Sequence, residues 1–202
     1  MKITNYNSYE AQKKAYNLIA KGYEKKMTNT FVGELNNVMN NKVINKFKLD
    51  SNKSYKIIDI GCGDGILLRK ILKLYPKTQS LGIDASENLI DIAKKKSFGN
   101  INFLVGDAMS LKISTKYDII LNVSVLHRLQ NPDLFIKNLN KINNEDTTYI
   151  ITTMNNISPQ FLLIKLIIFF SKIIKKPIQD QVAKKGFTKK QIELILRKEN
   201  YK

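Results

Sequence analysis

The sequence is poor in the residues that build disulfides and metal sites. Cys62 is the only cysteine and His127 the only histidine among 202 residues. A single cysteine cannot form an internal disulfide, and no cluster of Cys and His ligands is present to hold a metal. Residues 1–14 are polar and lack the apolar centre of a secretory signal peptide. We therefore expect no metal site and a cytoplasmic location.

Long apolar runs are also missing. The most apolar stretch, residues 161–170, is interrupted by Lys165, whereas a helix that crosses a bilayer needs about 20 apolar residues. Lys165, Lys172 and Lys176 would share one helix face, which predicts an amphipathic helix. Two roles for residues 161–178 stay open. The segment could be a lid or core helix, or it could contact an anionic membrane or a second subunit as a homodimer.

Arginine is scarce although the formal net charge is +17. A large positive charge often indicates nucleic acid or another anionic partner. Specific recognition of phosphates and base edges favours the planar, bidentate Arg side chain. Only Arg69, Arg128 and Arg197 carry it, and the remaining basic residues are Lys. A nucleic-acid partner therefore stays open but is not favoured.

The pattern of apolar residues divides the chain into three parts. Residues 1–50 are predicted to form a helical cap, in which Tyr9, Tyr16, Leu18, Ile19 and Tyr23 make a rough helical stripe. Residues 51–155 alternate between strands and helices. Residues 156–202 would form a lid and a final helix of the same domain.

The alternation within 51–155 predicts an α/β fold, in which a mainly parallel sheet has helices on both faces. Short β-branched runs predict the strands, at 55–60, 80–83, 101–105, 117–122 and 147–153. Periodic apolar residues with capping signals predict the helices, at 66–75, 86–96, 133–142 and 189–198.

A glycine-rich turn follows the first predicted strand, in the sequence IIDIGCGDG over residues 57–65. Glycines allow a ligand to approach the backbone closely, and the next helix offers free N–H groups. The dinucleotide fingerprint wants a small residue where this chain has Ile66, and Asp59 would repel a diphosphate. A carboxylate at residue 59 suits an ammonium group, which S-adenosylmethionine carries together with a sulfonium and no phosphate.

Two further acids end the second and third predicted strands. Asp84 lies 23 residues after Gly61. A carboxylate at this position can accept hydrogen bonds from both hydroxyls of a ribose. Asp107 could accept a hydrogen bond from the amino group of adenine, while the backbone of Ala108 bonds to the edge of the adenine ring. The alternatives are an N-cap role for Asp84 and an ordinary Gly-Asp turn at Asp107.

Taken in order, the segments IIDIGCGDG, LGIDAS, VGDAMSL and YDIILNVSVLHRL are similar to class I S-adenosylmethionine-dependent methyltransferases. They most resemble the bacterial group that includes ubiquinone- and menaquinone-biosynthesis and small-molecule methyltransferases. The resemblance implies a Rossmann-like, doubly wound sheet of about five strands in the order 3-2-1-4-5. It places the cofactor at Asp59, Gly61, Cys62, Gly63, Asp84, Ala85, Asp107, Ala108 and Asn122, with Asn122 beside the transferred methyl group.

The chain departs from that family in two places. Residues 143–146 replace the usual proline-glycine-glycine turn before the fifth strand. The antiparallel strand pair that normally ends the fold is missing, so we expect either a short sheet or a truncated chain.

His127 follows the fourth strand and is the candidate catalytic residue. It could act as a general base, because an unperturbed histidine titrates near neutrality, or it could only position or pack. The implied function is methyl transfer from S-adenosylmethionine to a small-molecule or lipid-like acceptor. An RNA or protein methyltransferase, suggested by the charge, and a cofactor-binding domain without catalysis are the alternatives.

Overall fold

The structure is a computed structural model that describes residues 8–28, 30–47, 49–155 and 187–198. Its elements follow in the order α1 Tyr9–Thr28, α2 Phe31–Ile44, β1 Lys56–Ile60, α3 Ile66–Leu74, β2 Gln79–Asp84, α4 Glu87–Lys95, β3 Ile101–Val105, the short 3-10 helix η1 Ala108–Ser110, β4 Tyr117–Val123, a second 3-10 helix η2 Leu126–Arg128, α5 Pro132–Leu139, β5 Asn143–Thr152 and α7 Lys189–Lys198. The amphipathic segment expected at residues 161–178 lies outside the described residues.

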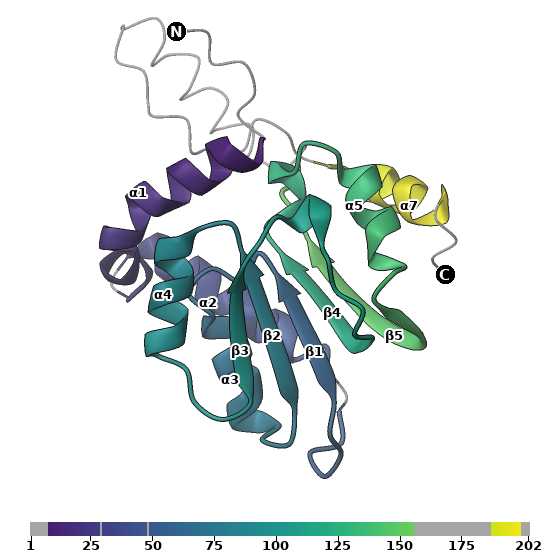
Figure 1. Ribbon diagram of the computed structural model, residues 1–202, viewed down its shortest axis with the longest axis horizontal. Helices are drawn as coiled ribbons and strands as arrows, with labels where there is room; N and C mark the ends of the chain where they lie inside the picture. The colour runs from purple at the N-terminus through teal and green to yellow at the C-terminus, as the bar shows by residue number, and fades with distance from the viewer. Residues whose placement is uncertain (1–7, 29, 48, 156–186, 199–202) are drawn as a thin grey trace, which may run out of the picture.

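The strands form one parallel sheet in the order β3-β2-β1-β4-β5, which confirms the predicted fold class (Figure 1). β1 lies in the middle and pairs with β2 and β4. Its apolar residues Ile57, Ile58 and Ile60 are fully buried, as expected of a strand covered on both faces. In the part of the chain that the structure describes, every strand pair is parallel.

Two hydrophobic cores cover the two faces of the sheet. On one face, Ile57 packs with Leu68 of α3 and Ile90 of α4. On the other face, Ile58 packs with Phe135 of α5, and residues of α7 close that core at its margin. Neighbouring residues of a strand point to opposite faces, so β1 contributes to both cores. Burying each of these large side chains stabilises the fold by about 1.5–3 kcal/mol.

The fifth strand begins earlier than the sequence predicted. β5 starts at Asn143, and its register to β4 shifts between the pairs Tyr117–Asn143 and Ile119–Thr148. The Thr147 hydroxyl lies within this irregularity, where it donates to the carbonyl of Tyr117 at 2.7 Å and accepts from the N–H of Asn144 at 2.6 Å. The expected turn at 143–146 is therefore a bulge inside the strand, held by a threonine side chain.

The first helix lies across one end of the sheet, beside α4 (Figure 1). The predicted apolar stripe is only partly correct, because Leu18 is 71% exposed. Tyr16, Ile19 and Tyr23 of that stripe face a cavity instead of a packed core. Among the helices described here, none is both long enough and apolar enough to span a membrane.

Candidate active site

A cavity of about 1160 Å³ lies between the carboxyl ends of the strands and helices α1 and α2. Open α/β sheets bind their ligands at this edge. The structure brings nearly all the predicted site residues to the wall of this cavity, namely Asp59, Gly61, Cys62, Gly63, Asp84, Ala85, Asp107, Ala108 and His127. All the predicted site residues except Asn122 therefore line the same cavity.

Asn122 does not line the cavity, contrary to the expectation that it lies beside the transferred methyl group. Its side chain is fully buried, and its amide nitrogen donates to the carbonyl of Ile60 at 2.9 Å. Asn122 thus ties the end of β4 to the end of β1. Val123 and Ser124, the next residues along the chain, reach the cavity in its place.

The glycine turn after β1 has a backbone conformation that favours glycine. Gly61 and Gly63 have φ angles of 87° and 56°, a region that other residues enter only with strain. At Gly61 a side chain would also collide with Val125, whose Cγ2 atom lies 2.2 Å from the position of an added Cβ. The turn therefore needs glycine for two reasons at this position, conformation and space.

Asp84 holds the glycine turn and the next helix together. Its carboxylate accepts from the N–H of Gly63 at 2.9 Å and from the N–H of Ser86 at 2.9 Å. Burial raises the pKa of Asp84, while these N–H bonds act in the opposite direction. Asp107, on the next strand, accepts from the N–H of Met109 at 2.9 Å. Both acids thus organise their turns and line the cavity at the same time.

Asp59 is a buried carboxylate with incomplete hydrogen bonding. It is 2% exposed, and its Oδ1 atom has no hydrogen-bond partner within the described ranges. Burial, and then the negative charge of Asp84, raise the pKa of Asp59 to about 7. A cation placed beside these two acids would offset that electrostatic cost. An ammonium group is a cation of this kind.

Sequence reasoning missed the part of the wall that comes from the N-terminal helices. Tyr16 and Tyr23 enter from α1, and Met39 and Asn40 enter from α2. Burial raises the pKa of both tyrosines, and the hydroxyl of Tyr23 lies 3.4 Å from where a Cβ on Gly63 would be. The seven-residue spacing of the two tyrosines on one helix face was visible in the sequence. The stripe alone does not predict a place in the cavity wall, because the position of the two tyrosines over the strand ends depends on tertiary structure.

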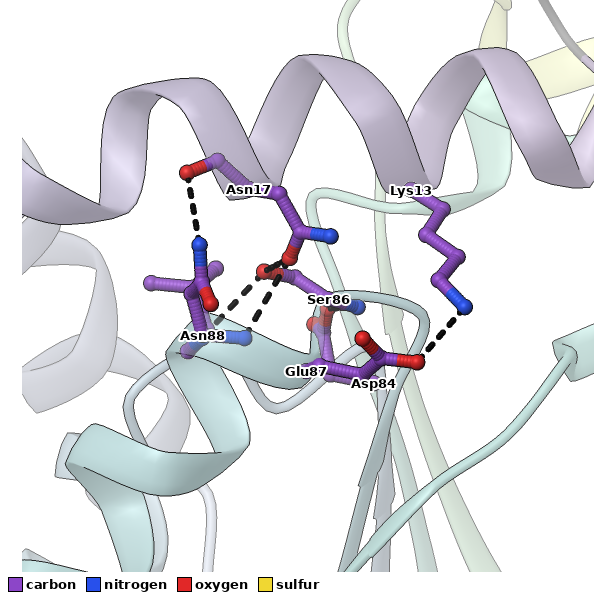
Figure 2. Close-up of polar contacts among 7 residues, drawn as sticks. Lys13, Asn17, Asp84, Ser86, Glu87 and Asn88 are labelled. Atoms are coloured by element: carbon purple, nitrogen blue, oxygen red, sulfur yellow. Dashed lines mark hydrogen bonds and ion pairs between the residues drawn. The ribbon is translucent and has the colours of Figure 1, made fainter.

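Polar contacts fix α1 to the start of α4, next to Asp84 (Figure 2). The Asn17 side chain accepts from the hydroxyl of Ser86 at 2.7 Å and from the N–H of Asn88 at 3.2 Å. Lys13 pairs with Glu87 at 2.7 Å. Ser86 also caps α4 by accepting from the N–H of Leu89. The helix that covers the cavity is therefore bonded to the same turn that positions Asp84.

We expect Asn17→Ala to loosen α1 without unfolding the sheet. The substitution removes one acceptor from the buried Ser86 hydroxyl, which costs about 1–2 kcal/mol, whereas β1 to β5 keep their contacts. Hydrogen exchange should show faster exchange in α1 than in the wild type and unchanged exchange in β1. Lys14→Ala, an exposed position on the same helix, is the control. Equal acceleration in α1 and β1 would contradict a local role.

No three His, Cys, Asp or Glu side chains within the described ranges are arranged to hold a metal ion. Cys62 is buried, and burial raises the pKa of its thiol, which disfavours the reactive thiolate. The cavity therefore offers carboxylates, backbone N–H groups, tyrosines, one histidine and one arginine, Arg128. Such a set of acids and hydrogen-bonding groups suits a polar ligand that carries a positive charge.

A doubly wound parallel sheet with a glycine turn, acidic strand ends and a cavity at the carboxyl edge defines a Rossmann-like domain. The sequence pattern of one family, described as a methyltransferase domain, matches residues 51–199. The chain belongs to this methyltransferase domain family.

Individual relatives are similar over shorter stretches. A ubiquinone biosynthesis O-methyltransferase from Pelagibacter ubique is 34% identical over 120 residues, covering 56% of this chain and 49% of the relative. A malonyl-[acyl-carrier protein] O-methyltransferase from Priestia megaterium is 29% identical over 131 residues, covering 64% of this chain and 46% of the relative. The chain thus spans about half the length of these curated relatives.

The fold also matches solved structures. A SAM-dependent methyltransferase from Thermotoga maritima superposes with a TM-score of 0.69 at 16% identity, covering 95% of this chain and 81% of the other. The [4+2]-cyclase SpnF superposes with a TM-score of 0.65 at 16% identity, covering 76% and 62%. Identities this low support the shared fold alone, and a cyclase among them shows that the fold by itself does not define the reaction.

Proposed function

We propose that this protein transfers a methyl group from S-adenosylmethionine to a small-molecule or lipid-like acceptor. The observation that carries the proposal is the buried pair Asp59 and Asp84 beside the glycine turn, in a chain of the methyltransferase domain family. Asp59 would face the ammonium group of the cofactor, Asp84 its ribose, and Asp107 with Ala108 its adenine. When bound, S-adenosylmethionine supplies a methyl group activated by a sulfonium.

The size of the cavity supports a second ligand beside the cofactor. Pockets that enclose one drug-sized ligand measure about 300–1,000 Å³, and this cavity of about 1160 Å³ exceeds that range. With the cofactor at the acids, the acceptor would occupy the side of the cavity toward β4 and β5, which Val125, His127 and Met154 line. Holding donor and acceptor in contact there would supply much of the rate enhancement, because proximity alone can lower a barrier greatly.

The names of the relatives support a small acceptor group. One is named for ubiquinone biosynthesis and another for a malonyl group on its carrier protein. The described lining of the cavity holds four aspartates and one arginine, Arg128, so the +17 charge of the chain is not concentrated at this site. We also propose a cytoplasmic location, on the basis of the single cysteine, and a membrane or homodimer contact through residues 161–178.

We expect S-adenosylmethionine to bind wild-type protein in calorimetry and Asp84→Asn to weaken that binding by about 1.5–3 kcal/mol, the range for hydrogen bonds to a charged group. Asp91→Asn, an exposed acid of α4, should bind like the wild type. Failure of the wild type to bind S-adenosylmethionine would exclude the proposed function. Equal affinity in both variants would remove Asp84 from the cofactor site.

A further inference from the structure

The two ring nitrogens of His127 have different surroundings. The backbone N–H of Met154 donates to Nδ1 at 3.4 Å, and the hydroxyl of Thr153 lies 3.3 Å from the same atom. A backbone N–H can only donate, so Nδ1 is the acceptor and carries no proton. A neutral imidazole then has its proton on Nε2. The end of β5 thereby selects one tautomer of the ring.

The second nitrogen is left without a partner. Nε2 is buried, no hydrogen-bond partner for it exists among the residues described, and His127 is 1% exposed while forming part of the cavity wall. A buried N–H without an acceptor is costly, so this atom points to a ligand. Burial, and then the charge of Arg128, lower the pKa of His127 to about 3, which keeps the ring neutral.

This arrangement is wrong for a general base. A base needs a free lone pair within reach of the proton that it removes. The lone pair of Nδ1 is engaged by Met154, and Nε2 already holds a proton. His127 can therefore donate a hydrogen bond to an oxygen of the acceptor, but it cannot take a proton from it.

Among the residues that the structure describes, this half of the cavity is lined by no second histidine and no carboxylate. Four acids line the cavity. Asp59 lies in β1, Asp84 ends β2, and Asp64 and Asp107 lie in the turns after β1 and β3. The lining residues described on β4, η2 and α2 include no Asp or Glu, and the ionised side chain there is Arg128, stacked 5.3 Å from the ring centre of Tyr16. Hydrogen-bond donors and a cation would therefore face an acceptor held in this half, whereas the carboxylates would face the cofactor.

An acceptor that needs no deprotonation fits this half best. Alcohols, most phenols and ammonium groups must lose a proton before or during attack on a methyl group. A carboxylate is already ionised at neutral pH, and its negative charge suits a neutral N–H donor and a nearby guanidinium.

We propose that the acceptor presents a carboxylate, that the Nε2–H group of His127 donates to one of its oxygens, and that the product is a methyl ester. The inference rests on the proposed function and deepens it. One carboxylate oxygen forms the new bond to the methyl carbon as the carbon–sulfur bond of the sulfonium breaks. That bonding pair stays on sulfur, which becomes a neutral thioether, and no proton moves. His127 positions the oxygen throughout.

The first test is the tautomer, which ¹⁵N NMR can read without ambiguity because His127 is the only histidine. With S-adenosylhomocysteine bound, we expect a protonated Nε2 and an unprotonated Nδ1, unchanged between about pH 5.5 and about pH 8. Adding octanoate should shift the Nε2–H resonance. A proton on Nδ1, a ring that titrates near its ordinary pKa, or no response to octanoate would overturn the donor role.

The second test is the acceptor class. Straight-chain carboxylates from butyrate to decanoate are compared with alcohols, phenols and amines of matched length, and S-adenosylhomocysteine release and methyl esters are measured. We expect turnover of carboxylates. Turnover of the other classes alone, or of none, overturns the carboxylate assignment. Calorimetry with S-adenosylmethionine on the same samples separates this failure from failure of the proposed function, because cofactor binding does not depend on the acceptor.

Substitution separates a donor from a base. His127→Gln keeps an N–H donor but cannot accept a proton at neutral pH, whereas His127→Ala removes both. We expect His127→Gln to keep kcat within about ten-fold of wild type and His127→Ala to lose about 100-fold or more, a range typical of one positioned polar group. Equal losses in the two variants, with cofactor affinity and thermal unfolding unchanged, would contradict the donor role.

Discussion

Asp59→Asn should produce a protein that is more stable than the wild type and binds S-adenosylmethionine more weakly. The wild-type carboxylate is buried with no cationic partner among the described residues, and its pKa is raised from 3.8 to about 7. One pKa unit corresponds to about 1.4 kcal/mol, so we expect the free energy of unfolding of the ligand-free variant to rise by about 2–4 kcal/mol at pH 8. Loss of the contact to the ammonium group should weaken binding by about 1.5–3 kcal/mol.

The stability difference between Asp59→Asn and the wild type should depend on pH. A carboxylate whose pKa is raised by folding holds its proton more tightly in the folded state, so its contribution to stability falls as pH rises from about 4 to about 7. The amide that replaces the carboxylate in Asp59→Asn cannot titrate. The difference in stability between the variant and the wild type should therefore be largest above pH 7 and shrink toward about pH 4.

His127 does not disturb this comparison, because both proteins contain it. Its own pKa is lowered by folding, so its contribution to stability is lost in the opposite direction, as pH falls. Urea unfolding of both proteins across this pH range measures the difference, with the exposed Asp91→Asn as control. A variant less stable than the wild type at pH 8 would show that Asp59 has a partner that compensates its charge.

Gly61→Ala should destabilise the fold more than the same change at Gly63. Both residues have positive φ, and placing Ala there costs about 1–2 kcal/mol. At Gly61 the new methyl group would also lie 2.2 Å from Cγ2 of Val125, and relieving such overlap costs about 1–3 kcal/mol more. At Gly63 the nearest atom, the hydroxyl of Tyr23, is 3.4 Å away, which is ordinary contact.

Thermal unfolding of the two variants provides the measurement, and two further proteins complete the design. Val125→Ala in the Gly61→Ala background removes the colliding methyl group and should recover part of the lost stability, a coupling that a double-mutant cycle isolates. Gly22→Ala is the control, because no heavy atom lies within 4 Å of the added Cβ and alanine favours a helix. No recovery in the double variant would exclude a clash with Val125.

The sheet was predictable because its signals are local. The β-branched residues of β1 predicted a buried strand, Ser86 predicted the start of α4, and the glycines predicted a turn, which the structure places at positive φ. Each of these residues acts on neighbours within a few positions of the chain. The early start of β5 depends instead on a hydrogen bond from the hydroxyl of Thr147 to Tyr117 on another strand. The residues around Thr147 in the sequence do not predict this contact.

The candidate site was predictable on one side only. Asp59, Asp84 and Asp107 lie at or just after the ends of consecutive strands, so their common edge follows from a parallel sheet. Tyr23 and Asn40 reach the cavity only through the packing of α1 and α2 over that edge. The tautomer of His127 depends on the backbone of Met154, 27 residues further along the chain, and no spacing rule predicts such a contact.

The unequal distribution of acids in the cavity has a consequence for turnover. In the proposed reaction the cofactor enters with a sulfonium and leaves as an uncharged thioether, so one positive charge disappears inside the cavity that Asp59 and Asp84 line. Two charges about 4 Å apart interact by about 4 kcal/mol at an effective dielectric constant near 20. The reaction itself therefore removes part of the electrostatic attraction between the cofactor and the acids of the cavity. We expect product inhibition to be weak in the wild type and stronger, relative to substrate affinity, when Asp59 is neutral.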